Sequence, residues 1–507
     1  ITPGDKPRDT VYRPLRTSPT FRHPTGHGNA PRSRDVPVPG TKPLPPEFGY
    51  ASRTSFDDIT SLDELDAIAR RLYSVAHASP DEARESLRLI VLRDQAELIP
   101  PLVHAMQFTQ LTEAEISEAL RRLSGVNAGV TWFEWAQWLE SQPQLVLTPG
   151  LAHGVVAMWR ALDGKYRHVL PAEQTTQVPK ASIYWDGSRV DAITARHMPK
   201  AVGPNEGFTL KASDLVLGVS SGGAFRAYPL PQLLFNPIIN DHLGGRAITV
   251  AYETLCGFPV AYDRGAAAAP DIPEMHWSGL VYRSARLLYT DGSTEDQAMT
   301  PRLWDPCTNR SVSGGSAGAS ERLPLANATV TSWSAWRSAY PQTTVMDVAQ
   351  APRASDESLD AQDIYIGTPS LVYPVHLNNP QLPAKERMLL IDMGARDDAI
   401  RLGDLKHRSV VNHRFDEEGV VIIVENPLTC TIRVYRRPEG QIFAPSEFVD
   451  RVYGSGGGIW KVTEDALVGP DGEALERLPA RGLFWFSVDG LNPLTEASLG
   501  QSASLVE

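Results

Sequence analysis

The sequence predicts an α+β fold in which an N-terminal helical-repeat-like domain precedes two tandem β-rich modules related by internal duplication. Three observations carry this prediction: helix-starting motifs are concentrated before residue 173, short β-like runs follow it, and two C-terminal stretches repeat each other's motifs in order. The predicted parts are a proline-rich extended arm (1–52), the helical domain (53–172), β-rich module one (173–349), a connection (350–384) and β-rich module two (385–507).

Length and composition are typical of a soluble globular protein with roughly three domains. The chain has 507 residues, of which 42% are hydrophobic and 21% charged. No apolar run approaches the ~18 residues of a membrane span. A net charge of -12 argues against nucleic acid as a partner, because the surface as a whole repels phosphate. The chain begins at Ile1, and we expect a leader peptide to have been removed.

Residues 1–52 are predicted to form an extended arm. Proline-rich sequence such as VPVPGTKPLPPEFGY has no apolar periodicity, so it cannot bury a core of its own. We expect the arm to be mobile or to wrap around a neighbour. Stacked helices expose a groove, and the arm and the helical domain are therefore expected to contact a protein partner.

The helical domain is predicted from capping boxes, in which a Ser or Thr and a Glu three residues later satisfy the free amide groups of a first turn. Gly125 suits a C-terminal cap. In the stretch DEARESLRLIVLRDQAELIPPLVHAM we expect a helix, a break near Pro100 and Pro101, and a second helix. The four candidate boxes are Ser61 with Glu64, Ser79 with Glu82, Thr112 with Glu115, and Thr131 with Glu134.

One aromatic face is predicted in the stretch TWFEWAQWLE, where Trp132, Trp135 and Trp138 recur at spacings of three. Two interpretations are open: the indoles pack in the core, or they form a platform for a ligand. We favour core packing.

After about residue 181, runs such as LVLGV, AITVAYE and FPVAY, broken by Gly, Pro and Asn, predict strands. Their motifs recur in order in the C-terminal portion, which predicts two copies of one module. The polar stretch QAPRASDESLDAQD between them is interpreted as a linker. The matched pairs are Asn240 with Asn412, Glu253 with Glu425, Tyr262 with Tyr435, Trp304 with Trp460, Trp333 with Trp485, and Pro341 with Pro493.

Motifs of the first module, from about Leu215 to Thr343, carry a family resemblance. They are DLVLGV, GGAFRAYPL, INDHLGGRAITVAYETLCGFPVAYDR, SGLVYRS, LW and TSWSAWRSAYPQT. With them the module resembles the bacterial domain-of-unknown-function family three-one-seven-nine, and the second module resembles a degraded copy. The family's name assigns no activity.

The resemblance also points to a site, because typical members carry W-H-E before I-V-N-D and C-P-L-C-G at the following turn. Such a set offers a histidine and two thiols for a soft metal or a disulfide. This chain departs from the pattern at both places: residues 235–237 read Phe-Asn-Pro, and Glu253 replaces the first cysteine, leaving Cys256. The candidate pocket consists of Asn240, Asp241, Glu253 and Cys256.

Three states of Cys256 follow from this pattern. His276 and Cys307 could complete a metal site with it, for copper or another transition metal, although no cofactor is assigned. Cys256 and Cys307 could instead form a disulfide, which would stabilise the fold by roughly 3 kcal/mol. In the third state the thiols are buried and inert.

The arm, the helical groove and the loss of the family's His and Cys positions together favour a binding or structural role, as a subunit of a larger assembly. Because we expect a leader to have been removed, we expect an extracytoplasmic protein, periplasmic or secreted. The alternative is a metal-dependent or redox enzyme that uses a pocket in the first β-rich module.

Overall fold

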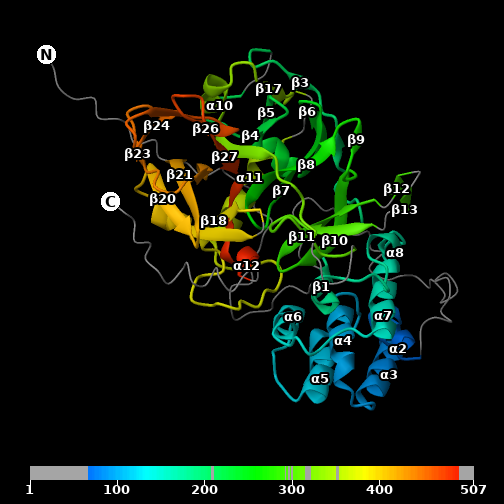
Figure 1. The fold of residues 1–507 in the computed structure, drawn as a ribbon. Helices are drawn as coiled ribbons and strands as arrows, with labels where there is room; N and C mark the ends of the chain where they lie inside the picture. The colour runs from blue at the N-terminus through cyan, green and yellow to red at the C-terminus, as the bar shows by residue number, and fades with distance from the viewer. Residues whose placement is uncertain are drawn as a thin grey trace.

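The computed structural model of the chain shows the helices of residues 67–169 gathered at one end and two β-rich halves at the other (Figure 1). It describes residues 67–206, 210–291, 293–294, 297–298, 301–314, 321–349, 353–394, 396–489 and 491. The mixture of helices and strands makes this an α+β protein, as predicted. The arm of residues 1–52, the box of Ser61 and Glu64, and Pro493 lie outside the described residues.

Several helices of the N-terminal end begin and end where their capping residues predict. Thr112 with Glu115 and Thr131 with Glu134 form complete capping boxes, and Gly125 ends its helix at a φ of 72°. The elements in chain order are α2 (Ala67–His77), α3 (Pro80–Val91), η3 (Ala96–Leu98), α4 (Ile99–Ala105), α5 (Glu113–Ser124), α6 (Trp132–Glu140), α7 (Pro149–Arg160) and α8 (Tyr166–Val169).

Two local predictions need correction. Ser79 precedes α3 but forms no cap bond to the backbone; its hydroxyl donates to the Glu82 carboxylate at 3.1 Å. The break expected at Pro100 and Pro101 lies earlier, between α3 and α4, and both prolines occupy the first turn of α4. A proline at that position is favourable because its missing N–H would have no partner within the helix.

The core of the helical end continues into the neighbouring β-sheet. Trp132 and Trp135 are buried in it, which confirms the core interpretation for these two residues, and Trp138 packs against it. The same cluster includes Tyr184 and Val281 on two strands of the sheet. The helices therefore brace the β-rich region through a shared core rather than standing apart from it.

The first half (residues 183–346) contains three larger sheets, ordered β1-β10-β11-β14-β15, β2-β6-β7-β8-β9 and β16-β4-β5-β17-β3, and the small pair β12-β13. Its elements are η4 (Lys180–Ser182), β1 (Ile183–Trp185), β2 (Arg196–His197), β3 (Ala201–Val202), β4 (Leu215–Ser221), β5 (Ala224–Pro229), α9 (Leu230–Phe235), β6 (Ile238–Leu243), β7 (Arg246–Glu253), β8 (Phe258–Ala266), β9 (Ala269–Pro270), β10 (Met275–Tyr282), β11 (Ala285–Thr290), β12 (Ser293–Thr294), β13 (Gln297–Ala298), β14 (Arg302–Asp305), β15 (Arg310–Ser311), β16 (Asn327–Ser332), α10 (Trp333–Ala339) and β17 (Thr344–Met346).

The second half (residues 387–488) contains a sheet ordered β19-β18-β28 and a larger one ordered β20-β21-β22-β27-β26-β25-β24-β23. Its elements are β18 (Arg387–Asp392), β19 (Asp397–Arg401), η5 (Leu402–Leu405), β20 (Val410–Phe415), β21 (Glu418–Asn426), β22 (Thr431–Arg437), β23 (Phe443–Pro445), β24 (Arg451–Gly454), β25 (Ile459–Val462), β26 (Ala466–Val468), β27 (Ala474–Leu478), β28 (Ala480–Phe484) and α12 (Trp485–Val488).

The two halves lie against each other through reciprocal strand contacts. Strand β16 of the first half contacts β22 of the second, and β28 of the second half contacts β8 of the first. A core cluster spans the junction and joins Phe258 and Trp304 to Leu390 and Phe484. Side chains from both halves therefore meet at this junction.

The connection between the halves contains a helix where the sequence suggested only a polar linker. This helix, α11 (Asp356–Gly367), begins after Ser355, whose hydroxyl accepts the Ser358 N–H at 3.1 Å. Tyr365 is buried, and its hydroxyl donates to the Leu255 carbonyl at 3.0 Å. Burial of the inner face against the turn after β7 stabilises a helix that lacks an amphipathic pattern in its sequence.

Among the residues that the structure describes, no helix is both long enough and apolar enough to cross a membrane.

Candidate functional site: a cavity between the two halves

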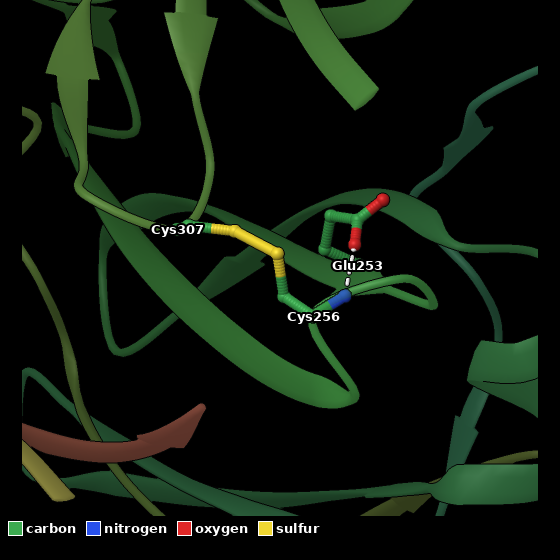
Figure 2. Close-up of side chains that lie close together, drawn as sticks. All are labelled: Glu253, Cys256 and Cys307. Carbon is green, nitrogen blue, oxygen red and sulfur yellow. Dashed lines mark hydrogen bonds between the residues drawn. A yellow bond between two sulfur atoms is a disulfide. The ribbon is translucent and has the colours of Figure 1, made fainter. Parts of the chain in front are cut away.

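A disulfide joins the turn after β7 to the segment after β14. Figure 2 shows Cys256 and Cys307 linked through their sulfur atoms beside Glu253. The two Cα atoms lie 6.8 Å apart and the residues are 51 positions apart in sequence. With its sulfurs in this bond, neither cysteine offers a thiolate to a metal or a substrate.

Glu253 organises the turn that carries Cys256. Its carboxylate accepts the Cys256 N–H at 2.6 Å, and its carbonyl accepts the Gly257 N–H at 2.9 Å. Gly257 has a φ of 76°, which favours glycine at this position. A carboxylate that accepts a backbone N–H three residues later fixes a tight turn, so Glu253 has a structural role here.

Burial also changes the acidity of Glu253. It raises the pKa of Glu253 to about 7, against the opposing effects of the Arg286 charge and of backbone hydrogen bonds. The Arg286 guanidinium is buried, lies 3.9 Å from the Asp186 carboxylate, and donates to the Thr254 hydroxyl at 2.7 Å. Glu253 therefore changes protonation near neutral pH inside a buried polar cluster.

The other residues of the predicted pocket lie elsewhere. The Asn240 amide donates to the Met275 carbonyl at 3.0 Å and accepts the Met275 N–H at 3.1 Å, which ties β6 to β10. The Asp241 carboxylate accepts hydrogen bonds from Arg226 at 2.6 Å and Tyr228 at 2.8 Å. Of the four predicted residues, the structure brings Glu253 and Cys256 together, whereas Asn240 and Asp241 hold strands in place.

His276 is also separate from the disulfide. Its ring lies 6.1 Å from that of His197 and 5.3 Å from that of Tyr289, measured between centroids. Among the described residues, the group of potential metal-ligating atoms within 4.8 Å of one another consists of Glu253, Cys256 and Cys307. His276 does not belong to that group.

A cavity of about 530 Å³ lies between the halves, with Cys256 in its wall. Most of its lining side chains are apolar and come from β4, α9, β8, β16, α11 and β28. Its volume and lining are those of a small-molecule site. The apolar members are, for example, Leu215, Leu217, Leu230, Leu234, Val260, Ala328, Val330, Leu359, Ile366 and Leu483.

A few polar groups also line this cavity. Arg481 is buried, whereas Arg387 is exposed. On α11, burial and the neighbouring Asp360 raise the pKa of Asp363 to about 6. Burial raises the pKa of the Cys430 thiol to about 11, so this cysteine is a poor nucleophile at neutral pH.

The sequence interpretation missed two features of this cavity, Arg481 and helix α11. Arg481 lies in a strand, and its sequence neighbours give no sign that it is buried. Helix α11 had a usable signal, since Ser355 followed by Asp356 and Glu357 is typical of a helix N-terminus.

Fold and cavity together define an α+β protein whose two β-rich halves enclose an apolar site between them. The chain belongs to the family described as "Protein of unknown function (DUF3179)", whose model matches residues 191–495. The match covers both halves, so the resemblance expected for residues 215–343 extends through the second half. No curated protein and no solved structure matches the chain.

Proposed function

We propose that this protein binds a small, largely apolar molecule in the cavity between its two halves. The observation that carries the proposal is the cavity of about 530 Å³, lined mostly by apolar side chains from both halves and from α11. Transfer of an apolar molecule from water to such a surface is favourable. Sites of this kind combine an apolar wall with a few polar groups that orient the ligand.

The test is binding of a neutral apolar dye, Nile red, to the full chain and to a variant with a filled cavity. Ala328→Trp adds an indole at a half-buried lining position on β16. Ala474→Trp is the matched control, because Ala474 is exposed on β27 and does not line the cavity. We expect saturable binding by the native chain and by A474W, and loss of binding in A328W. Equal binding by all three would contradict the proposal.

We further propose that the two halves are copies of one module and that the cavity formed at their junction. The support is a shared order of pairing: β16-β4-β5 corresponds to β28-β18-β19, and β6-β7-β8 corresponds to β20-β21-β22. Trp333 and Trp485 each begin the helix that follows the edge strand, at α10 and α12.

Side-chain contacts at matched positions add to this support. The Asn412 amide donates to the Phe443 carbonyl at 2.7 Å and accepts the Phe443 N–H at 2.9 Å, as Asn240 does with Met275. The hydroxyls of Tyr262 and Tyr435 each donate to a backbone carbonyl shortly after Trp304 or Trp460, at Pro306 and Thr463 respectively.

An extracytoplasmic location, periplasmic or secreted, is also proposed. Its support is the Cys256–Cys307 disulfide, because such bonds persist in oxidising compartments. Alkylation of thiols in intact cells, followed by mass spectrometry, tests it: Cys256 and Cys307 should escape labelling until a reductant is added. Labelling of both without reductant would contradict this location.

We propose that the helical end is helical-repeat-like and, with the arm, docks a protein partner in a larger assembly. The support is a cleft of about 540 Å³ between α3 and α5, lined by both charged and apolar side chains such as Arg84, Leu87 and Glu118. Light scattering of native material checks this: an assembly is expected for the full chain, and a monomer for a chain that lacks residues 1–52.

A second candidate function is metal binding by the reduced protein, the basis for a metal-dependent or redox enzyme. It is favoured by the proximity of Glu253, Cys256 and Cys307, whose potential ligand atoms lie within 4.8 Å of one another. Reduction would supply two thiolates beside one carboxylate, a donor set that zinc accepts. Zinc titration with and without prior reduction tests it: stoichiometric binding should require the reductant and fail in Cys307→Ser.

A further inference from the structure

Arg481 is one of the residues that line the cavity. Its side chain comes from β28 and is only 6% exposed. One guanidinium nitrogen, Nη2, donates to the Cys307 carbonyl at 2.8 Å and to the Asn309 amide oxygen at 3.3 Å. The other two nitrogens, Nε and Nη1, are buried and have no hydrogen-bond partner among the described residues.

The other buried arginines of the second half are neutralised by carboxylates. Arg433 pairs with Glu464 at 2.9 Å, and Arg477 lies 3.6 Å from the same side chain. Arg481 has no such ion pair within the part of the chain that the structure describes. A buried charge without a counter-charge is unfavourable, so a missing anion would stabilise this position.

Asp305 is close enough to Arg481 for their charges to interact, but the two side chains form no ion pair. Its carboxylate accepts the Cys307 N–H at 2.8 Å and the Thr308 hydroxyl at 2.8 Å. Burial raises the pKa of Asp305, against hydrogen bonds to Thr308 and Cys307 and the Arg481 charge. The carboxylate is therefore held by the turn around Cys307, and the Nε and Nη1 groups of Arg481 stay unmatched.

We infer that the ligand of the cavity is amphipathic and carries a carboxylate, which pairs with Arg481 while its hydrocarbon part lies against the leucines of the wall. The inference rests on the proposed function and names the chemical class of its ligand. A guanidinium offers two parallel N–H groups that match the two oxygens of a carboxylate. The low dielectric of an apolar cavity strengthens such a pair.

An arginine outside the cavity provides the control. Arg408 is exposed and does not line the cavity. A charge in contact with water interacts weakly with an anion, because the solvent screens it. Arg408→Met should therefore leave ligand preference unchanged, whereas Arg481→Met should alter it.

The experiment compares decanoate with decan-1-ol, which share a hydrocarbon chain and differ in charge, by calorimetric titration at pH 7.5. We expect the native chain to bind decanoate more tightly than the alcohol, on the order of tenfold. In R481M the affinity for decanoate should fall to that for the alcohol, which should itself stay unchanged. R408M should keep the native preference.

The outcomes separate the two claims. Equal affinities for decanoate and decan-1-ol in the native chain overturn the carboxylate inference and leave the proposed function intact. Binding of neither ligand, nor of Nile red, overturns the proposed function and the inference with it. Should R481M fail to fold, Arg481→Lys replaces it: lysine keeps the charge but loses the paired N–H groups, so an unchanged preference there also overturns the inference.

Discussion

The guanidinium of Arg481 donates to the backbone carbonyl of Cys307 at 2.8 Å, across the junction of the two β-rich halves. The arginine belongs to β28 of the second half, whereas Cys307 follows β14 of the first half and is bonded to Cys256. The disulfide thus holds in place the carbonyl that positions the cavity's buried charge. Breaking the disulfide should therefore also change the ligand preference of the cavity.

Loss of the disulfide should destabilise the fold. In the loop-entropy account, a bond that closes 51 residues of chain stabilises by about 4 kcal/mol. Cys307→Ser, measured by urea unfolding, should therefore lower the free energy of unfolding by about that amount. Cys430→Ser is the control, because Cys430 is a free thiol. A change in C307S no larger than in C430S would show that the bond contributes nothing.

The protonation of Glu253 should make stability fall as pH rises. Its pKa is about 7 in the fold against 4.5 in the unfolded chain, so between these values the folded state binds more protons and stability decreases with pH. Glu253→Gln should remove about 3 kcal/mol of this pH dependence. Burial raises the pKa of Glu140 to about 7 as well, so some dependence remains in the variant. Unfolding free energies at pH 4.5 and 7.5 provide the measurement.

Glu464 provides a control, because its pKa shift is opposite in direction to that of Glu253. Burial opposes ionisation of this carboxyl, but the Arg433 and Arg477 charges hold the pKa of Glu464 below its usual range. A lowered folded pKa gives stability that is present above the unfolded pKa and is lost as pH falls. Glu464→Gln should therefore destabilise more at pH 7.5 than at pH 4.5. The same pH trend in E253Q and E464Q would contradict one of the two assignments, and the direction of the trend would show which one.

The paired asparagines should differ in their effect on stability although they make the same backbone contacts. Asn240 is fully buried, and its amide oxygen also accepts the Thr249 hydroxyl at 2.7 Å; Asn412 is half-buried. Asn240→Ala should cost about 3 kcal/mol, because buried polar groups lose their partners, and Asn412→Ala about 1 kcal/mol, because water replaces the amide. Thermal unfolding of both variants provides the measurement. An equal or larger loss of stability in N412A than in N240A would contradict the prediction.

Gly218 should tolerate no side chain. A Cβ at this position in β4 would collide with the Trp336 ring of α10. Gly218→Ala should destabilise by about 2 kcal/mol, because a packed core cannot make room for the methyl group without strain. Gly456→Ala is the control, since a Cβ there would meet nothing within 4 Å. Similar unfolding midpoints for G218A and G456A would contradict the packing argument.

Local signals in the sequence predicted local structure well. The boxes at Thr112 and Thr131 and the cap at Gly125 depend on residues close together in the chain, and all three are present. Helix α11 was missed although its first residues, from Ser355 to Glu357, are typical of a helix N-terminus. The rest of its sequence has no apolar face, and the helix is stabilised by burial against a distant turn. The sequence singled out Asn240 as a candidate pocket residue. Its observed role, joining β6 to β10, depends on which strands are neighbours in the fold.

Residue patterns alone were enough to predict the α+β class, the helix boundaries set by capping residues and the family to which the chain belongs. The packing of distant strands settled the rest: Cys256 meets Cys307, Asn240 lies opposite Thr249 rather than beside Glu253, and Arg481 at the apolar cavity has no carboxylate partner among the described residues. Distance along the chain explains this difference. Caps and turns form between residues a few positions apart, whereas a cavity and its lining residues come from strands of opposite halves that pack together.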